Sequence, residues 1–165
     1  HDYFIDVPDE VVELFKEYDY RLQKIEKKYT NDPDDPVILE EYCDFLKEYL
    51  SQGFMEKQME QIYRNQYTQL LLKQLEQKVN LHTCVCLMEN LMVQRDFFLA
   101  EKILKIMDQN WHRGEEYWIW KIRYLAERKM GKELKQSLQA LKEEHIYLSS
   151  RGKEALGFWL DGSKK

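Results

Sequence analysis

The 165-residue chain has the composition of a folded protein, with 44% hydrophobic, 33% charged and 13% aromatic residues. Its net charge of −5 argues against direct binding of a nucleic-acid backbone, which requires a basic face that releases counterions. No apolar run approaches the roughly 20 residues that span a bilayer, and the opening residues lack the pattern of a secretory signal. Their abrupt start suggests a fragment of a longer protein.

The three cysteines, Cys43, Cys84 and Cys86, are an odd set without the spacing of a disulfide scaffold. Such usage is typical of a reducing compartment, so a cytoplasmic protein is expected. No proline occurs after Pro36. Because proline breaks helix interiors, the stretch from Val37 to Lys165 favours helices.

The first predicted helix covers residues 9–29. In front of it, Tyr3 to Val7 alternate weakly, as in a short strand, and Pro8 suits the first helical position. Apolar residues then recur at steps of four and three, which makes a seam able to pack along a second helix. The seam residues are Val11, Phe15, Tyr18, Leu22, Ile25 and Tyr29. Because fewer than three heptads are present, an intramolecular helix pair is preferred to a dimerising coiled coil.

Two more helices are predicted before residue 80. Asp35 in front of Pro36 is a helix-start signal, and the helix that it opens is predicted to run to Leu50. The longest helix is predicted from Phe54 to about Val79, with Asn80 marking its end.

After residue 80 the apolar pattern repeats with a period of 34. The matched pairs are Cys84 with Trp118, Val85 with Ile119, Met88 with Ile122, Leu91 with Leu125, Met92 with Ala126, Ala100 with Leu134, Leu104 with Leu138 and Met107 with Leu141. Two helices per unit and this period are the dimensions of a tetratricopeptide repeat. The predicted helices are 81–94 and 96–109 in the first copy, and 115–129 and 132–145 in the second.

The repeat motif itself is present in a degenerate form. Residues Arg95 to Glu101 resemble the Gly-Asp-Tyr-x-x-Ala core of such repeats, where a small alanine at Ala100 lets two helices cross closely. Arg95 replaces the usual turn glycine, and Leu134 stands where the second copy would have alanine. A last helix over residues 149–160, opened by Ser149 or Ser150 and carrying Leu156, Phe158 and Trp159, would cover the open end of the array.

These patterns predict an all-α fold, a tetratricopeptide-like right-handed array of antiparallel helix hairpins with a C-terminal capping helix. The chain is expected to form a single helical regulatory domain over residues 1–165. Within it, 1–8 are a linker or short strand, 9–79 the N-terminal helices, 81–145 two degenerate repeats and 149–160 the capping helix.

The order of segments resembles the bacterial transcriptional activator domain of antibiotic-regulatory-type regulators. The residues that carry this resemblance are Asp2-Tyr3-Phe4-Ile5-Asp6-Val7, Glu60-Gln61-Ile62-Tyr63-Arg64-Asn65-Gln66-Tyr67, the unit from Asp96 to Met107, and Met130-Gly131-Lys132. The chain departs from the family at Phe54-Met55, where a tryptophan is common. The resemblance implies a tetratricopeptide-like domain that follows a DNA-binding winged helix, sometimes with a receiver domain further upstream.

Residue types able to perform chemistry are present without a convincing arrangement. In His82-Thr83-Cys84-Val85-Cys86, His82 and Cys86 share a helix face, but Cys84 lies about 160° away from Cys86, and no second ligand pair follows. His112 and His145 lack a nucleophilic partner in local sequence. Glu115-Glu116 and Glu143-Glu144 are interpreted as solvated helix faces rather than acid–base pairs. No enzyme activity, metal or cofactor is therefore expected.

The helix predicted over residues 115–129 is apolar on two sides. Trp118, Ile119, Ile122 and Leu125 form one face, and Tyr117, Trp120 and Tyr124 form the other. Packing of the second face on a neighbouring helix is the preferred interpretation. The alternative places Tyr117, Trp120, Arg123 and Tyr124 in a partner-binding groove, since aromatic and arginine side chains are common binding anchors.

The leading functional hypothesis is a protein–protein interaction and oligomerisation domain that regulates a bacterial transcription factor. Its partners would be a protein or peptide, a second copy of the chain included, with DNA bound only through an attached domain and no membrane contact. The second hypothesis is a free-standing tetratricopeptide-type peptide receptor or scaffold protein.

Overall fold

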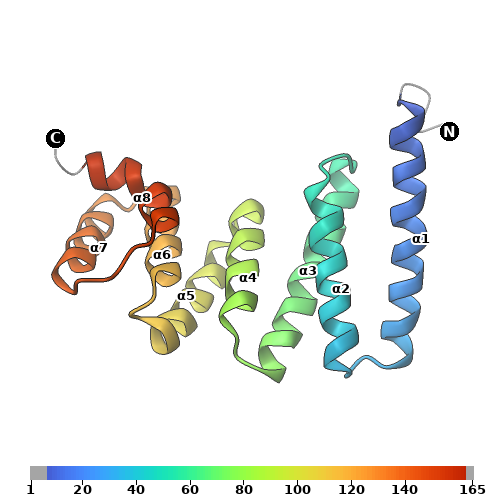
Figure 1. Ribbon diagram of the computed structural model, residues 1–165, viewed down its shortest axis with the longest axis horizontal. Helices are drawn as coiled ribbons and strands as arrows, with labels where there is room; N and C mark the ends of the chain where they lie inside the picture. The colour runs from blue at the N-terminus through green and yellow to red at the C-terminus, as the bar shows by residue number, and fades with distance from the viewer. Residues whose placement is uncertain (1–6, 163–165) are drawn as a thin grey trace. The chain divides into compact units, whose positions relative to one another are not determined.

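The computed structural model describes residues 7–162, and within that range it contains eight α-helices and no strand (Figure 1). The helices are α1 (Asp9–Asn31), α2 (Pro36–Ser51), α3 (Lys57–Gln77), α4 (Leu81–Gln94), α5 (Phe97–Trp111), α6 (Glu115–Glu127), α7 (Gly131–Glu143) and α8 (Ser150–Gly162). The prediction of an all-helical fold is confirmed for these residues. The strand predicted at Tyr3–Val7 falls outside the described residues except for Val7, which is in a bend.

The chain divides into two compact units, His1–Lys78 with α1 to α3 and Val79–Lys165 with α4 to α8. In the first unit, α2 contacts both α1 and α3. In the second, α5 contacts α4 and α6, and α6 also contacts α4, α7 and α8. Helix α6 is therefore the most enclosed helix of the second unit.

Helix α2 starts where the sequence predicts. The Asp35 carboxylate accepts hydrogen bonds from the backbone N–H groups of Val37, at 2.8 Å, and Ile38, at 3.4 Å. Helix α1 begins at Asp9, the first residue of the predicted range, but Pro8 is the residue that precedes the helix and not its first residue. The Pro8 carbonyl accepts the first bonds of that helix.

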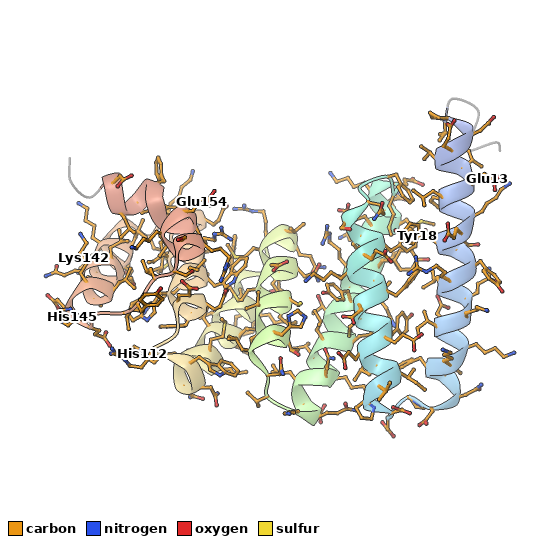
Figure 2. The ribbon with its side chains drawn as sticks, viewed as in Figure 1. Glu13, Tyr18, His112, Lys142, His145 and Glu154 are labelled. Atoms are coloured by element: carbon orange, nitrogen blue, oxygen red, sulfur yellow. The ribbon has the colours of Figure 1, made fainter. Side chains whose placement is uncertain are left out.

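Aromatic rings fill the core of the first unit. Tyr18 points from α1 toward α2 (Figure 2), where its ring stacks on Tyr49 with centroids 4.9 Å apart. Phe54 lies 6.0 Å from the Tyr18 ring, 6.1 Å from Tyr49 and 5.6 Å from Phe15. The prediction that α3 starts at Phe54 is wrong, because this ring packs into the cluster from a loop and the helix begins only at Lys57.

Helices α4 and α6 end in the same way, one repeat period apart in the chain. Arg95, which follows α4, has a left-handed backbone with φ of 58°. Lys129, two residues after the end of α6, is also left-handed, with φ of 55°. Each end also has the two backbone bonds of a Schellman motif, which satisfies carbonyl groups of the last helical turn. These N–H to carbonyl bonds run from Arg95 to Met92 and Asp96 to Leu91 in the first copy, and from Lys129 to Ala126 and Met130 to Leu125 in the second. The matching ends of these two helices are therefore one predicted period apart in the chain.

Burial follows the same period. Both members are buried in five of the predicted pairs, which are Cys84 with Trp118, Met88 with Ile122, Leu91 with Leu125, Leu104 with Leu138 and Met107 with Leu141. The period also reaches α8, because Met88, Ile122 and Leu156 follow one another at this same spacing and each is 0% exposed. Helix α8 therefore occupies the position along the chain that corresponds to α4 and α6.

Candidate functional site

The aromatic face predicted on α6 lies inside the second unit. Tyr117 is 4% exposed, Trp120 8% and Tyr124 5%, and only Arg123 is half-buried. These exposures agree with the interpretation that the face packs on neighbouring helices. Binding of a partner by these four residues stays a prediction, and it would require the rings to become accessible.

Each of these side chains already has neighbours within the unit. The Tyr124 hydroxyl accepts a hydrogen bond from Arg128 at 3.0 Å, and its ring meets Phe97 edge-on at 6.0 Å. The Arg123 guanidinium lies 5.0 Å from the Trp120 ring centroid. Burial raises the pKa of Tyr117 well above its usual range. The aromatic face is thus part of the core that surrounds α6.

The His82 to Cys86 segment forms the start of α4. Cys86 Sγ lies 3.6 Å from His82 Nε2. Cys84 is fully buried, and desolvation raises the pKa of its thiol to about 11, which keeps it protonated at neutral pH. Within residues 7–162, no group of three or more His, Cys, Asp or Glu side chains could hold a metal ion.

His112 joins the end of α5 to the end of α7. When protonated, its ring donates through Nδ1 to Asp108 at 2.5 Å and through Nε2 to Glu144 at 2.6 Å. The hydrogen bond to Glu144, which has the larger effect, and the one to Asp108 raise the pKa of His112. The backbone is fixed as well, because Trp118 Nε1 donates to the His112 carbonyl at 2.7 Å and Arg113 donates to the Glu144 carbonyl at 2.9 Å. With both ring nitrogens engaged, His112 forms a clamp between the ends of α5 and α7.

Glu115, the first residue of α6, accepts hydrogen bonds from Ser149, the residue before α8. The Ser149 backbone N–H and hydroxyl donate to its carboxylate at 2.8 and 2.9 Å. Partial burial would raise the pKa of Glu115, but the bonds from Ser149 and the nearby Arg151 outweigh it and lower the pKa. Arg151 also pairs with Glu116. The acidic pair Glu115-Glu116, interpreted from sequence as a solvated face, is instead half-buried and holds two helices together.

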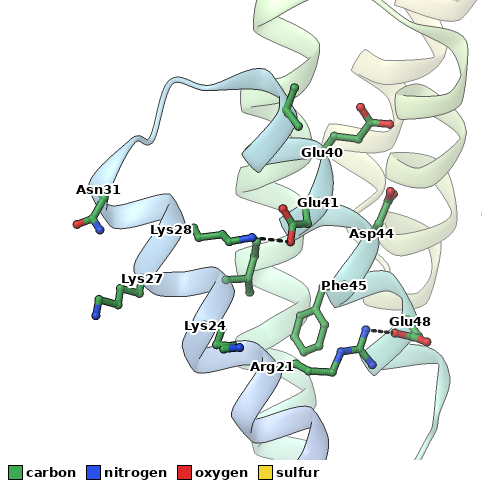
Figure 3. A pocket seen from close by; sticks show the side chains of 12 residues that line it. Arg21, Lys24, Lys27, Lys28, Asn31, Glu40, Glu41, Asp44, Phe45 and Glu48 are labelled. Carbon is green, nitrogen blue, oxygen red and sulfur yellow. Dashed lines mark hydrogen bonds and ion pairs between the residues drawn. The ribbon is translucent and has the colours of Figure 1, made fainter.

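A groove of about 1200 Å³ runs between α1 and α2 in the first unit (Figure 3). Helix α1 lines it with Arg21, Lys24, Ile25, Lys27, Lys28 and Asn31. Helix α2 lines it with Val37, Glu40, Glu41, Asp44, Phe45 and Glu48. The groove therefore has one basic wall and one acidic wall, with apolar side chains between them.

Two ion pairs cross this groove. Arg21 Nη2 lies 2.7 Å from Glu48 Oε2, and Lys28 Nζ lies 3.3 Å from Glu41 Oε1. The Arg21 guanidinium also lies 5.0 Å from the centroid of the Phe45 ring. The later residue of α1, Lys28, pairs with the earlier residue of α2, Glu41. The two helices therefore run in opposite directions. The pairs hold the two walls in register.

This groove was not predicted, although the sequence carries a signal for it. Arg21, Lys24 and Lys28 recur at steps of three and four, and Glu40, Asp44 and Glu48 recur at steps of four. Each set makes a stripe of one charge along a helix. The stripes become a site only when the two helices lie side by side, which the charge pattern of either helix alone does not indicate.

Every helix in the described range is too short or too polar to cross a lipid bilayer. Comparison with protein-family models, with curated proteins and with solved structures found no match for this chain.

Proposed function

We propose that the chain is a protein-interaction domain built as a tetratricopeptide-like array, which acts through helix packing and partner binding rather than through chemistry. The observation that carries this proposal is the repeat period, which is shared by side-chain burial and by the backbone ends of α4 and α6. Two helices in a unit of this length are the dimensions of tetratricopeptide repeats, whose stacked units form extended binding surfaces.

The contacts of the second unit fit such an array. Each copy is a pair of consecutive helices in contact, α4 with α5 and α6 with α7, and α5 contacts α6 between the copies. The first helices of successive units also meet, because α6 contacts both α4 and α8. Helix α8 would then correspond to the first helix of a third unit, and it would cover the end of the array.

The engaged state of the titratable side chains also favours binding over catalysis. Both ring nitrogens of His112 are held by carboxylates, and Glu115 is held by Ser149. The Cys84 thiol is buried and protonated. A catalytic base needs an atom that is free to take a proton, and a nucleophile needs an accessible thiolate. The hydrogen bonds of His112 and Glu115 and the burial of Cys84 therefore favour a structural role for these groups.

The resemblance to bacterial transcriptional activator domains narrows the proposal to a regulatory and oligomerisation domain of a transcription regulator. A net charge of −5 fits this role, because DNA would be bound by an attached winged helix and not by these helices. The second candidate is a free-standing peptide receptor of tetratricopeptide type. The groove between α1 and α2 favours this second candidate, because a concave surface lined by charged and apolar side chains could hold a peptide segment.

The full-length protein distinguishes the two candidates. A winged helix encoded directly in front of Asp2 is expected for the regulator, and its absence would favour the receptor. For the regulator, deletion of residues 2–162 should abolish self-association in sedimentation velocity and should change the affinity for operator DNA. If the deleted protein keeps both its oligomeric state and its regulated DNA binding, the regulatory proposal is wrong.

A further inference from the structure

We infer that the groove between α1 and α2 binds an amphipathic helix whose two polar flanks carry opposite charges, acidic toward α1 and basic toward α2. This inference rests on the proposed interaction function and names the kind of partner that the first unit takes. The length of the groove, the side chains in it that form no ion pair and the opposite charges of its two walls favour such a partner.

The dimensions of the groove suit a short helix. Its lining extends from Arg21 to Asn31 on α1 and from Val37 to Glu48 on α2. Both stretches are about 15 Å long, because a helix rises about 1.5 Å per residue. A partner helix of about ten residues would therefore match both walls along their length. Val37, which is 70% exposed, offers it an apolar contact at one end of the groove.

The charges of the groove are only partly used within the protein. Arg21 with Glu48 and Lys28 with Glu41 neutralise each other across it. Within the described residues, Lys24 and Lys27 on α1 and Glu40 and Asp44 on α2 are in no ion pair. We call these four side chains the rim charges.

The rim charges lie on opposite edges of the groove. Figure 3 shows Lys27 directed away from α2, and Glu40 and Asp44 directed away from α1. A helix lying along the groove would rest between the two edges with one flank beside each. The rim charges are thus available to a partner without breaking the ion pairs that hold the walls together.

The opposite sign of the two walls selects the charge pattern of the partner. A uniformly charged helix would be attracted by one wall and repelled by the other, so its electrostatic gain would largely cancel. A helix with glutamates on one flank and lysines on the other gains at both walls. Its direction is also fixed, because turning it end for end would place like charges together.

The test uses the whole chain and two synthetic peptides of identical composition. Each is a helix of about 18 residues, long enough for measurable helicity, with leucines at i, i+3, i+4 and i+7. One carries glutamates on one flank and lysines on the other, and the second mixes both charges on each flank. Fluorescence anisotropy should show at least about fivefold tighter binding of the segregated peptide at low salt, with the difference shrinking at about 0.5 M salt.

Charge-reversal variants locate the binding. Lys24→Glu with Lys27→Glu should weaken binding of the segregated peptide about tenfold, and Glu40→Lys with Asp44→Lys should weaken it similarly. Reversal of all four should restore the affinity, because the peptide can then bind in the opposite direction. Lys132→Glu with Lys135→Glu is the matched control, with the same charge change and spacing on exposed residues of α7. Circular dichroism checks that each variant keeps its helicity.

Three outcomes overturn the inference. They are equal affinity for both peptides, binding of neither peptide, and rim variants that behave like the control variant on α7. If the segregated peptide binds and all variants weaken it equally, the chain binds helices elsewhere, so the groove is excluded while an interaction function stands. The proposed function fails separately, through the deletion experiment on the full-length protein.

Discussion

The two copies in the second unit carry different residues on one face, which in the second copy was considered as an alternative partner-binding groove. In α6 this face carries Tyr117, Trp120 and Tyr124. The residues 34 positions earlier in α4 are Thr83, Cys86 and Asn90, and all six side chains are buried, with exposures between 2% and 8%. One copy thus buries polar and small groups where the other buries aromatic rings. Burial of this face follows from the position of the helix in the unit, whatever side chains it carries.

This comparison explains why a helix that is apolar on two sides is not by itself a binding site. Helix α6 contacts α4, α5, α7 and α8, so both of its apolar faces meet protein. The aromatic residues increase the apolar area buried there, which increases stability. Substitutions at equivalent positions of the two copies should therefore separate the effect of position from that of residue type.

The largest effect is expected at the equivalent pair Trp118 and Cys84, which are 2% and 0% exposed. Trp118→Ala should lower the free energy of unfolding of the second unit by about 3–5 kcal/mol, because it empties a large core volume. It also removes the hydrogen bond to the His112 carbonyl. Cys84→Ala should lower the free energy of unfolding by only about 1 kcal/mol, because only one sulfur atom is removed from the core.

Urea unfolding monitored by tryptophan fluorescence measures both variants. Trp111, Trp118, Trp120 and Trp159 are the four tryptophans of the chain, and all lie in the second unit. The signal therefore reports on that unit even if the first unfolds separately. Equal losses at the two positions would show that position alone decides stability and that the aromatic residues add nothing.

The next largest effect is expected at Gly152, the residue of α8 that stands 34 positions after Trp118. A Cβ at this position would collide with the Glu115 carboxylate. Gly152→Ala should therefore displace Glu115 from Ser149 and lower the unfolding free energy by about 1–3 kcal/mol, the range for hydrogen bonds to a charged group. Hydrogen exchange in α8 should rise at the same time.

Gly157→Ala is the matched control in the same helix. A Cβ there meets nothing within 4 Å. Because alanine is the better helix former, this variant should raise stability by about 0.5–1 kcal/mol. Destabilisation by both substitutions would mean that α8 does not tolerate alanine in general, and that the contact with Glu115 is not the cause.

Helix existence and helix ends were largely predictable from the sequence, because local signals specify them. Helix α4 has the predicted bounds, since Asn80 caps its start through Thr83 and Arg95 takes the left-handed turn at its end. Where a tertiary contact overrides the local pattern, as at Phe54, the predicted start was wrong. Local patterns thus predict the presence of a helix better than a start that a tertiary contact determines.

The site features depend on contacts between distant residues, which local patterns do not encode. The clamp at His112 requires Glu144, 32 residues further along the chain. The groove requires the basic stripe of α1 to lie beside the acidic stripe of α2. Sequence reasoning considered each residue within its own helix, so neither arrangement was expected.

The second helices of the two copies also end differently, and this difference predicts a pH effect. Helix α5 ends at the His112 clamp, whereas α7 ends near a left-handed residue, His145, with φ of 54°. Because the folded-state pKa of His112 is raised, its contribution to stability is full below about pH 6.5, the unperturbed value. It is lost as the pH rises through the higher folded-state pKa.

His112→Gln should remove this pH dependence. The expected difference between low and high pH is at most about 1 kcal/mol, because the His112 side chain is 39% exposed and solvent screens its ion pairs. Asp108→Asn keeps the shape and removes one charge, so it should reduce the dependence without abolishing it. Unfolding free energies of the wild type and both variants, measured from about pH 5.5 to pH 9, test this. Parallel curves for wild type and His112→Gln would exclude the clamp as the cause.

The smallest effect is expected at the left-handed residues Arg95 and Lys129, which follow the first helix of each copy. A non-glycine residue in this conformation is disfavoured by about 1–2 kcal/mol. Glycine avoids this cost, but part of the gain is lost because glycine has more conformational freedom in the unfolded chain. Lys129→Gly should therefore stabilise the second unit by about 0.5–1 kcal/mol. Arg95→Gly should gain less, because Arg95 pairs with Glu127 at 3.2 Å and lies 4.9 Å from the Phe97 ring centroid.

The difference between these two glycine variants measures what the Arg95 side chain adds to the first copy. Exposed ion pairs and ring contacts each contribute a few tenths to about 1 kcal/mol, so Arg95→Gly should be close to neutral. Lys129→Ala and Arg95→Ala are the controls, because alanine removes the side chain but keeps the strained conformation. Stabilisation by glycine but not by alanine at position 129 would show that the left-handed conformation, and not the lysine side chain, lowers the stability there. An equal gain from glycine at both positions would show that the Arg95 contacts do not stabilise the first copy, and that the side chain there is interchangeable with Lys129.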